Sequence, residues 1–487
     1  MVFSSVIFLF FFLPVVLVVH TLLPARARNL FLLLVSVLFY AWGEARFLWV
    51  MFTTSLLDYF AGLVIGREYE RQRAAGITSK SKTPLQKIAL AVSLAGNLGL
   101  LAFFKYAGFF AENISALLHQ TGLSDWVPDA VLKISLPLGI SFYTFQSLSY
   151  TIDVYRGSIR FTRSAVDFLC FVTLFPQLVA GPIVRYRDLA AELIARSLSR
   201  EKAAGGVRLF IIGLSKKMLI ANTLAVAADK IFAIPGDQLP MVTAWIGTIC
   251  FTFQLYFDFA GYSDMAIGLG LMLGFDFPKN FNYPFISRTM AEFWQRWHIT
   301  LSTWLRDYLF TPLGGYRCGR PRAYANVLIT FLLCGFWHGA AWNFICFGAI
   351  CGSCIVFERI IQSNRRAFFR NMTGCVFYLM PIVIFTMVVF RSDTMHACVL
   401  HWQAMLGLNA ALSSLHNARL YLNGELIFVL CAATLGSVPF APWLREKCRR
   451  AERLRRVTEL AYLLVILLLC AMKLAAGTYN PFIYFRF

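Results

Sequence analysis

The chain has 487 residues, of which 59% are hydrophobic and only 14% are charged. A soluble domain carries about 25% charged residues, so this composition excludes an ordinary soluble protein. The formal net charge of +20 would also suit nucleic-acid binding, but Lys and Arg lie in short loops between apolar runs. That distribution is the positive-inside pattern of a polytopic membrane protein, and we expect no nucleic-acid partner.

The N-terminal third contains apolar runs long enough to cross a bilayer, which takes about 20 residues per helix. Arg26 and Arg28 follow the first run. If basic loops face the cytoplasm, the N-terminus therefore lies outside. Residues 165–183 are apolar but are broken by Pro176 and Gly181. This pattern favours a re-entrant segment over a full crossing.

The C-terminal half is interrupted by residues 278–325, which combine aromatic and polar side chains with seven Lys and Arg residues. We expect interfacial amphipathic helices here, on the cytoplasmic side. The run 326–357 has basic segments on both sides, so it must cross an even number of times or dip and return. The last run, 457–476, leaves the C-terminus outside. In total, we predict an all-α polytopic protein with about nine to twelve crossings.

No internal repeat or long linker divides the sequence. We therefore predict a single membrane domain over 1–487. Its parts are N-terminal helices over 1–160, a core with interfacial helices over 161–360, and C-terminal helices with an outer tail over 361–487. The histidines and cysteines show no metal-binding spacing, so no metal site is expected.

His338 is the first candidate for chemistry, because it stands in an apolar and aromatic run between Gly335 and Gly339. A polar ring at membrane depth is energetically unfavourable and is a functional hypothesis by default. The two glycines are expected to leave space beside the ring for a substrate. Apolar neighbours favour neutral imidazole, which can accept a proton as a general base. The alternative is an interhelical hydrogen bond without a catalytic role.

His298 is the second candidate. Continuous helical spacing would place Trp294, His298 and Ser302 on one face. A polar group at the membrane interface explains this pattern as well as a functional site does.

Three more polar residues, Asp258, Tyr262 and Asp264, interrupt an apolar run. They would either line a channel or pair with arginines of the 278–325 stretch, and pairing is the favoured prediction. Further supporting or substrate-channel candidates are Trp337, Asn343, Arg296, Arg306 and Asp307.

Taken together, these segments resemble the membrane-bound O-acyltransferase (MBOAT) family. The likeness rests on Asp258–Gly274, Phe293–Tyr308, Trp337–Gly339, Leu136–Phe142, Ala180–Pro182 and the tail Pro481–Phe487. The resemblance extends over nearly the whole chain. Within the family, the sequence is most similar to the bacterial branch that O-acetylates alginate and to its peptidoglycan-acetylating relatives.

The resemblance implies a ring of membrane helices around a funnel-shaped core in the bacterial inner membrane. It implies acetyl-CoA as a cytosolic donor substrate, with no bound cofactor. The acetyl group would cross to a periplasmic SGNH-type acetyltransferase or acetyl-carrier protein. The family's essential histidine corresponds to His338, which would deprotonate the acceptor hydroxyl. Its second polar position corresponds to His298, which would orient the donor or stabilise the developing oxyanion.

The tail Asn480–Phe487 is similar to the C-terminal acceptor motif of the small partner peptide in teichoic-acid D-alanylation. Tyr484 is therefore a candidate acyl acceptor, and the alternative is an aromatic anchor at the membrane interface. Two other classes of function stay open: a transporter for a lipid-linked sugar, and a scaffold for a polysaccharide-secretion complex. Alginate, peptidoglycan or another extracytoplasmic glycan would all suit the same donor side.

Overall fold

The computed structural model describes residues 2–76, 81–119, 134–361, 375–409, 416–447, 452–477 and 479. All regular structure in these residues is helical, which confirms the all-α prediction. Packing divides the chain into two compact units. Unit 1 comprises Met1–Gly206 with Ala266–Pro278, and unit 2 comprises Val207–Met265 with Lys279–Phe487. These boundaries do not coincide with those predicted at 160 and 360, and the single membrane domain stays a prediction.

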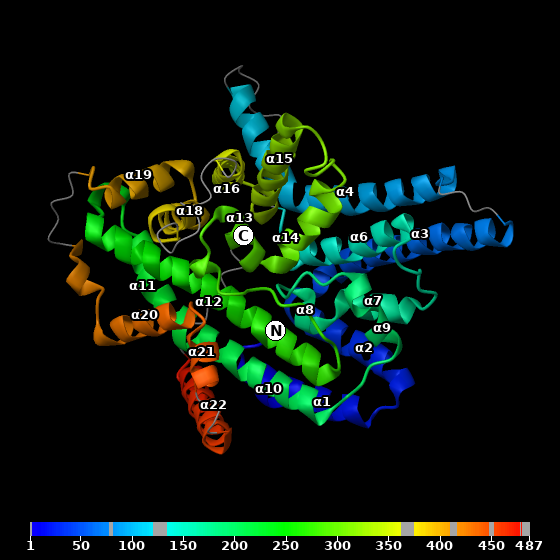
Figure 1. The fold of residues 1–487 in the computed structure, drawn as a ribbon, viewed down its shortest axis with the longest axis horizontal. Coiled ribbons are helices and arrows are strands. Elements are labelled where there is room, and N and C mark those ends of the chain that lie inside the picture. The colour runs from blue at the N-terminus through cyan, green and yellow to red at the C-terminus, as the bar shows by residue number, and fades with distance from the viewer. Residues whose placement is uncertain are drawn as a thin grey trace. The chain divides into compact units, whose positions relative to one another are not determined.

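Long helices packed side by side form the first part of unit 1, where α3 lies against both α4 and α6 (Figure 1). A buried acid joins the three helices. Asp58 of α3 accepts hydrogen bonds from Asn97 of α4 at 2.9 Å and from Thr151 of α6 at 3.1 Å. The helices here are η1 (Phe8–Phe12), α1 (Leu13–Leu22), α2 (Ala25–Glu44), η2 (Ala45–Phe47), α3 (Leu48–Ala74), α4 (Pro84–His119) and α6 (Ile140–Arg156).

The predicted re-entrant segment of unit 1 is formed by two short helices. α7 (Ala165–Thr173) has nine residues and α8 (Phe175–Leu178) has four. Neither approaches the length of about 20 residues that a crossing needs. Side chains from Phe168 to Val184 are largely buried in protein, as non-helical backbone at membrane depth requires. Unit 1 continues through α9 (Tyr186–Ile194) and the start of α10 (Arg200–Ser215).

A close helix crossing organises unit 2. A Cβ on Gly213 of α10 would lie 2.5 Å from the Gly261 carbonyl oxygen of α12, and one on Gly261 would lie 2.7 Å from the Gly213 oxygen. Only glycine allows this approach. It brings η4, which follows α10, beside the acidic residues of α12. The elements up to this point are η4 (Lys216–Ala221), α11 (Asn222–Phe232), η5 (Gly236–Gln238) and α12 (Met241–Leu273).

The stretch 278–325 forms four short helices. They are η6 (Pro284–Ile286), α13 (Met290–Arg296), α14 (Ile299–Leu305) and η7 (Arg306–Phe310). Their apolar side chains, among them Phe293, Leu301 and Trp304, are buried in unit 2.

Helices α15 (Arg320–His338) and α16 (Trp342–Ile361) pack against each other as a hairpin. Glycines make the contact possible, since a Cβ on Gly348 would lie 2.2 Å from the Phe331 carbonyl oxygen. A hairpin is the shape expected of a run that leaves and returns to one side, and its placement relative to the membrane stays a prediction. The remaining helices are η9 (Cys375–Leu379), α18 (Met380–Arg391), α19 (Met395–Met405), η11 (Ala418–Leu420), α20 (Gly424–Gly436), α21 (Phe440–Lys447) and α22 (Glu452–Ala475).

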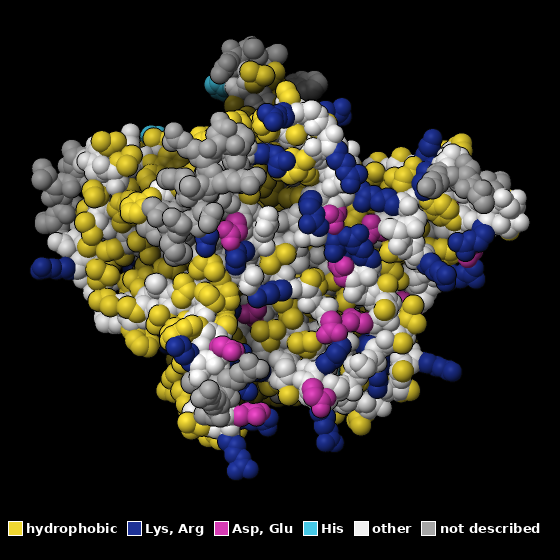
Figure 2. Space-filling view, in the orientation of Figure 1, with side chains coloured by type: hydrophobic (Ala, Val, Ile, Leu, Met, Phe, Trp, Pro, Cys, Tyr) yellow, Lys and Arg dark blue, Asp and Glu magenta, His cyan; other side chains and the backbone are white. Residues whose placement is uncertain are grey.

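Within the described residues, five helical segments are long and apolar enough to cross a membrane, or six if the bent pair α20 and α21 is one span. Hydrophobic side chains also cover wide areas of the surface (Figure 2). Both findings confirm a multi-pass membrane protein. The five are Ala25–Ala74, Pro84–His119, Arg200–Phe232, Trp342–Ile361 and Glu452–Ala475.

This number is lower than the predicted count of about nine to twelve crossings. The first segment joins α2 and α3 into one stretch of 50 residues. α12 is long, but it carries polar residues such as Gln254 and Asp258 inside. α1 and α18 are short. The total number of crossings stays a prediction.

Candidate functional site

His338 is the last residue of α15, at the turn into α16, and only 6% of its surface is exposed. Aromatic rings surround the imidazole. Ring centroids lie 4.9 Å away for Trp337, 5.2 Å for Phe390 and 6.1 Å for Phe347. The helix end thus presents a histidine within an aromatic environment, which disfavours the imidazolium charge.

The glycines around His338 do not make room for a substrate, so that prediction is wrong. A Cβ on Gly339 would lie 2.1 Å from the ring of Phe344, and one on Gly335 would lie 2.1 Å from the Phe344 carbonyl oxygen. The space beside these glycines is filled by α16. Their role is to let the two arms of the hairpin meet at the histidine.

Asn343, predicted to support the site, fixes the same corner of unit 2. Its side-chain amide donates hydrogen bonds to the carbonyl oxygens of Val389 at 3.2 Å and Ser392 at 2.7 Å. These residues stand at the end of α18, next to Phe390. Asn343 therefore holds α18 against the start of α16 and acts on His338 through packing.

His298 lies between α13 and α14 and is fully buried. Its backbone is left-handed, with φ 44°, which is uncommon outside glycine. The helix before it ends at Arg296, and Trp297 is extended. The continuous helix that would align Trp294, His298 and Ser302 does not exist, so that prediction is wrong. A strained conformation of this kind persists only where its surroundings fix it.

Asn280 fixes the His298 ring. The Asn280 Oδ1 lies 3.1 Å from His298 Nδ1 and also accepts hydrogen bonds from the Thr300 backbone N–H at 3.3 Å and hydroxyl at 2.9 Å. Its Nδ2 donates to Ser263 Oγ at 3.0 Å. A backbone N–H can only donate, so the atom facing Thr300 is the amide oxygen. His298 Nδ1 must then carry the proton, and Nε2 of neutral His298 is an acceptor.

Trp337 stands between the two histidines. Its ring centroid lies 6.2 Å from that of His298 and 4.9 Å from that of His338. Phe259 of α12 meets the His298 ring edge-on at 4.7 Å. His298 lies outside the candidate membrane-spanning segments. Burial lowers its pKa well below the usual value, and the charge of His338 lowers this pKa further. Burial therefore favours the neutral form of His298.

The acids of α12 are paired, but their partners differ from those predicted. Asp258 bonds Lys217 at 2.7 Å, with both side chains only 3% exposed, and Asp264 bonds Lys216 at 2.6 Å. The arginines of 278–325 are not involved in these two ion pairs. The lysines belong to η4, which the Gly213–Gly261 crossing brings beside α12. Tyr262, which lies between Asp258 and Asp264 in the sequence, is buried.

The remaining charged candidates lie on the short helices. Arg296 Nε bonds Glu292 at 3.0 Å, and its Nη1 donates to the Asn282 carbonyl oxygen at 3.2 Å. Arg296 thus braces the loop before α13. Arg306 bonds its neighbour Asp307 at 2.8 Å and is largely exposed.

A cavity of about 760 Å³ opens among α13, α14, η7, α15 and α16. Trp294 and Cys334 line its apolar part, and Cys334 lies one helical turn before His338. Arg306 and Arg317 also line it. The cavity therefore combines apolar walls with two guanidinium groups, which suit phosphate oxygens.

Sequence reasoning missed Glu358, a buried acid of α16. Its carboxylate accepts hydrogen bonds from the backbone N–H groups of Met290 and Ala291, the latter at 3.1 Å, and from the Tyr378 hydroxyl at 3.1 Å. It therefore caps α13 from another helix. The available signal was a single acid at the end of an apolar run. Asn280 and Lys217 were missed as well, because their partners are distant in sequence.

The structure brings His298, Trp337 and His338 together in unit 2, with Asn343 as a nearby support. Arg306 borders the 760 Å³ cavity. Tyr484 lies outside the described residues.

The sequence matches a family model and several curated proteins. The model described as "MBOAT, membrane-bound O-acyltransferase family" matches residues 158–395. The "Probable alginate O-acetylase AlgI" of Pseudomonas putida is 40% identical over the full length of both chains. A peptidoglycan O-acetyltransferase of Helicobacter pylori is 33% identical over 84% of this chain and 80% of its own. A teichoic acid D-alanyltransferase of Bacillus subtilis is 31% identical over 43% of this chain and 56% of its own.

The chain therefore belongs to the membrane-bound O-acyltransferase family. It is a multi-pass membrane protein and an O-acyltransferase, and both predictions are confirmed. The matched region contains His298 and His338, together with Asn280 and the acids of α12.

Proposed function

We propose that this enzyme takes an acetyl group from cytosolic acetyl-CoA and passes it across the bacterial inner membrane. The group would serve O-acetylation of an extracytoplasmic polysaccharide, with alginate first and peptidoglycan or another exopolysaccharide as the alternative. The observation that carries the proposal is the pair of buried histidines around Trp337, both in an environment that favours the neutral ring. The named activities of the similar proteins support the acetyl group and the two polymers.

His338 acts as general base in this proposal. Its neutral imidazole removes the proton of a hydroxyl as the oxygen attacks the thioester carbonyl carbon. The new C–O bond forms, the C–S bond breaks, and the imidazolium returns its proton to the departing thiolate. Base catalysis of this kind contributes about 10²–10⁴-fold to the rate.

The structure changes the role proposed for His298. An oxyanion is stabilised by hydrogen-bond donors, but the Nδ1 proton of His298 is directed at Asn280. Nε2 of the neutral ring accepts, so His298 suits orientation of a hydroxyl or of a protonated partner. We therefore propose that His298 orients the acceptor hydroxyl and not the acyl donor, and we withdraw its role as an oxyanion donor.

The 760 Å³ cavity is the proposed entry for the donor. Its volume falls within the range of about 300–1,000 Å³ typical of ligand sites. Arg306 and Arg317 would hold phosphate groups of CoA, since guanidinium groups bind phosphates in a bidentate manner. The apolar wall near Cys334 would receive the thioester arm and direct it toward His338.

The acceptor side of the proposal involves the tail and a partner. With both termini in the periplasm, Tyr484 would accept the acetyl group and hand it to an SGNH-type acetyltransferase or a carrier protein. Tyr479 donates a hydrogen bond to Asp229 at 3.0 Å, which anchors the start of the tail. Five residues span at most about 17 Å when extended, which sets the reach of Tyr484 from this anchor.

Purified protein in nanodiscs with acetyl-labelled CoA tests this function. We expect transfer to partner or tail with wild-type protein, loss of transfer with His338→Ala, and no change with the control His396→Ala, an exposed histidine of α19. Wild-type transfer by His338→Ala would remove the base from the mechanism. Absence of transfer in every variant, with partner present, would favour a transporter or a scaffold.

A further inference from the structure

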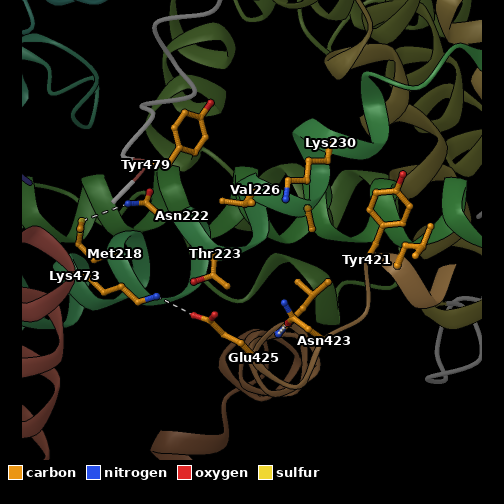
Figure 3. A pocket seen from close by; sticks show the side chains of 13 residues that line it. Met218, Asn222, Thr223, Val226, Lys230, Tyr421, Asn423, Glu425, Lys473 and Tyr479 are labelled. Carbon is orange, nitrogen blue, oxygen red and sulfur yellow. Dashed lines mark hydrogen bonds and ion pairs between the residues drawn. The ribbon is translucent and has the colours of Figure 1, made fainter. Parts of the chain in front are cut away.

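A second cavity of unit 2, about 330 Å³ in volume, lies where α11, the start of α20 and the end of α22 meet (Figure 3). It shares no lining residue with the 760 Å³ cavity. Its walls carry hydroxyl and amide groups, from Thr223 and Asn222 of α11, from Asn423 before α20, and from Tyr479. These groups suit a ligand that both donates and accepts hydrogen bonds.

One lysine that lines the cavity, Lys230, has no acidic partner among the described residues. Lys473 is bound to Glu425 at 2.9 Å, as the dashed line in Figure 3 shows. Asp229 is bound to Arg391 at 2.7 Å and to Tyr479. Among the residues that the structure describes, no acidic side chain lies within ion-pair distance of Lys230. The polar cavity therefore favours an anion at Lys230.

Apolar helix faces lead away from this cavity. On α20, Ile427 and Phe428 are 51% and 73% exposed, and on α22, Leu468 and Met472 are 63% and 59% exposed. Both helices pack on η4, and only 11% of the apolar stretch of α22 is buried. Glu425 lies in the first turn of α20 and Lys473 in the last turn of α22, so their ion pair lies at the end of both apolar faces. Such a boundary between apolar face and polar tip is typical of a membrane interface.

We propose that this cavity binds the headgroup of an anionic glycerophospholipid, of the phosphatidylglycerol class. Lys230 holds the phosphate, Thr223 and Asn423 bond the headgroup hydroxyls, and the acyl chains lie along α20 and α22. A free acidic sugar or inorganic phosphate would fill the cavity but leave the apolar faces uncovered. The small volume, near the lower end of about 300–1,000 Å³ for ligand sites, suits a headgroup. This inference does not rest on the acyl-transfer proposal.

Native mass spectrometry of the full-length protein from nanodiscs with equal phosphatidylglycerol and phosphatidylcholine tests the site. The wild type should retain phosphatidylglycerol in preference. Lys230→Met should lower the ratio of the two bound lipids about tenfold, as expected when one charged hydrogen bond is lost. Lys230→Arg keeps the charge and should retain the preference. Lys87→Met, at an exposed lysine of α4 in unit 1, is the matched control and should behave as wild type.

Several results would overturn the proposal. Equal retention of both lipids by the wild type, or an unchanged ratio in Lys230→Met, would show that no anionic headgroup binds at Lys230. Thermal unfolding of each variant shows whether it is folded. If Lys230→Met is misfolded, Lys230→Gln takes its place in the same experiment. Stabilisation by a hexuronate oligomer but not by phosphatidylglycerol would mean that the cavity is a carbohydrate site, and the lipid proposal would be wrong.

Discussion

At the scale of single residues, the hydrogen bonds of Asn280 determine what His298 can do. The Thr300 backbone N–H identifies the amide oxygen of Asn280, and this oxygen places the proton of His298 on Nδ1. A buried amide 18 residues away thus decides whether the histidine donates or accepts at Nε2. Catalytic histidines commonly depend on a second group that fixes their tautomer.

Asn280→Ala should remove the acceptor of three donors, namely His298 Nδ1–H and the backbone N–H and hydroxyl of Thr300. Each donor left unsatisfied costs about 1–3 kcal/mol in the free energy of unfolding. We expect kcat to fall about tenfold or more, with little change in KM for the donor, because the ring loses its orientation. Labelled-acetyl transfer and thermal unfolding measure the two effects. Ser263→Ala is the control, since it leaves the Asn280 oxygen in place. If Ser263→Ala lowered kcat as much as Asn280→Ala does, the argument from the tautomer of His298 would be wrong.

The pKa of His298 predicts the pH dependence. The folded pKa is lowered from 6.5, and only the neutral ring can accept at Nε2. Protonation removes this acceptor as the pH falls through the folded pKa, so the contribution of His298 to kcat/KM should remain constant down to pH 6.5 and decline only below it. Asn280→Asp places a negative charge beside the ring, which raises the pKa and should move the decline to higher pH. The base His338 must also be neutral, so the shift caused by Asn280→Asp is what separates the two histidines. A pH profile that Asn280→Asp leaves unchanged would contradict the role of His298.

Much of this site could be predicted from the sequence, and the predictions that failed did so for physical reasons. His338 and His298 stood out because polar rings are rare in apolar surroundings. The partners Asn280 and Lys217 did not, because tertiary contacts between distant segments leave no periodic signal. The Gly335 and Gly339 prediction failed because a missing Cβ makes room for whatever element packs there, and here it is α16.

At the scale of helices, the hairpin of α15 and α16 depends on glycine. Gly335→Ala would place a Cβ 2.1 Å from the backbone oxygen of Phe344, which cannot move without shifting α16. We expect a loss of about 1–3 kcal/mol in unfolding free energy and a loss of transfer, since His338 lies one turn further. Gly205→Ala, in a helix with open space around it, is the control and should not destabilise the protein. An unchanged melting temperature for Gly335→Ala would exclude this close packing.

The buried pair of Lys217 and Asp258 gives another test of helix packing. Lys217→Met should leave the Asp258 carboxylate buried without its cation, which costs about 3–5 kcal/mol. Adding Asp258→Leu should recover most of that loss, because burying two ions is itself unfavourable. Unfolding of the two single variants and the double variant in one detergent completes the cycle. Additive losses would show that the two side chains do not interact.

At the scale of the whole molecule, the sequence predicted a polytopic helical membrane protein because composition and charge distribution are properties of many residues together. The number of crossings stays a prediction, and the five or six candidate spans among the described residues are fewer than the nine to twelve predicted. Short helices such as α7, α13 and α14 are hydrophobic but have only seven to nine residues, too few to cross a bilayer. The helix α12 has 33 residues, but polar groups interrupt its apolar sequence. Most of their apolar side chains are buried within the protein.

The predicted orientation is the property on which the transfer of acetyl across the membrane depends. With basic loops inside, residues 67–87 face the cytoplasm and the C-terminus faces the periplasm. Alkaline phosphatase is active only outside, and green fluorescent protein fluoresces efficiently only inside. Alkaline phosphatase should therefore be active when fused after Phe487 and inactive when fused after Gly76. Green fluorescent protein should fluoresce when fused after Gly76 and should not fluoresce when fused after Phe487. A C-terminal fusion that fluoresces and lacks phosphatase activity would place Tyr484 on the cytoplasmic side. From there Tyr484 could not deliver acetyl to a periplasmic partner, so its role as acceptor would be wrong. The role of His338 as general base does not depend on this result.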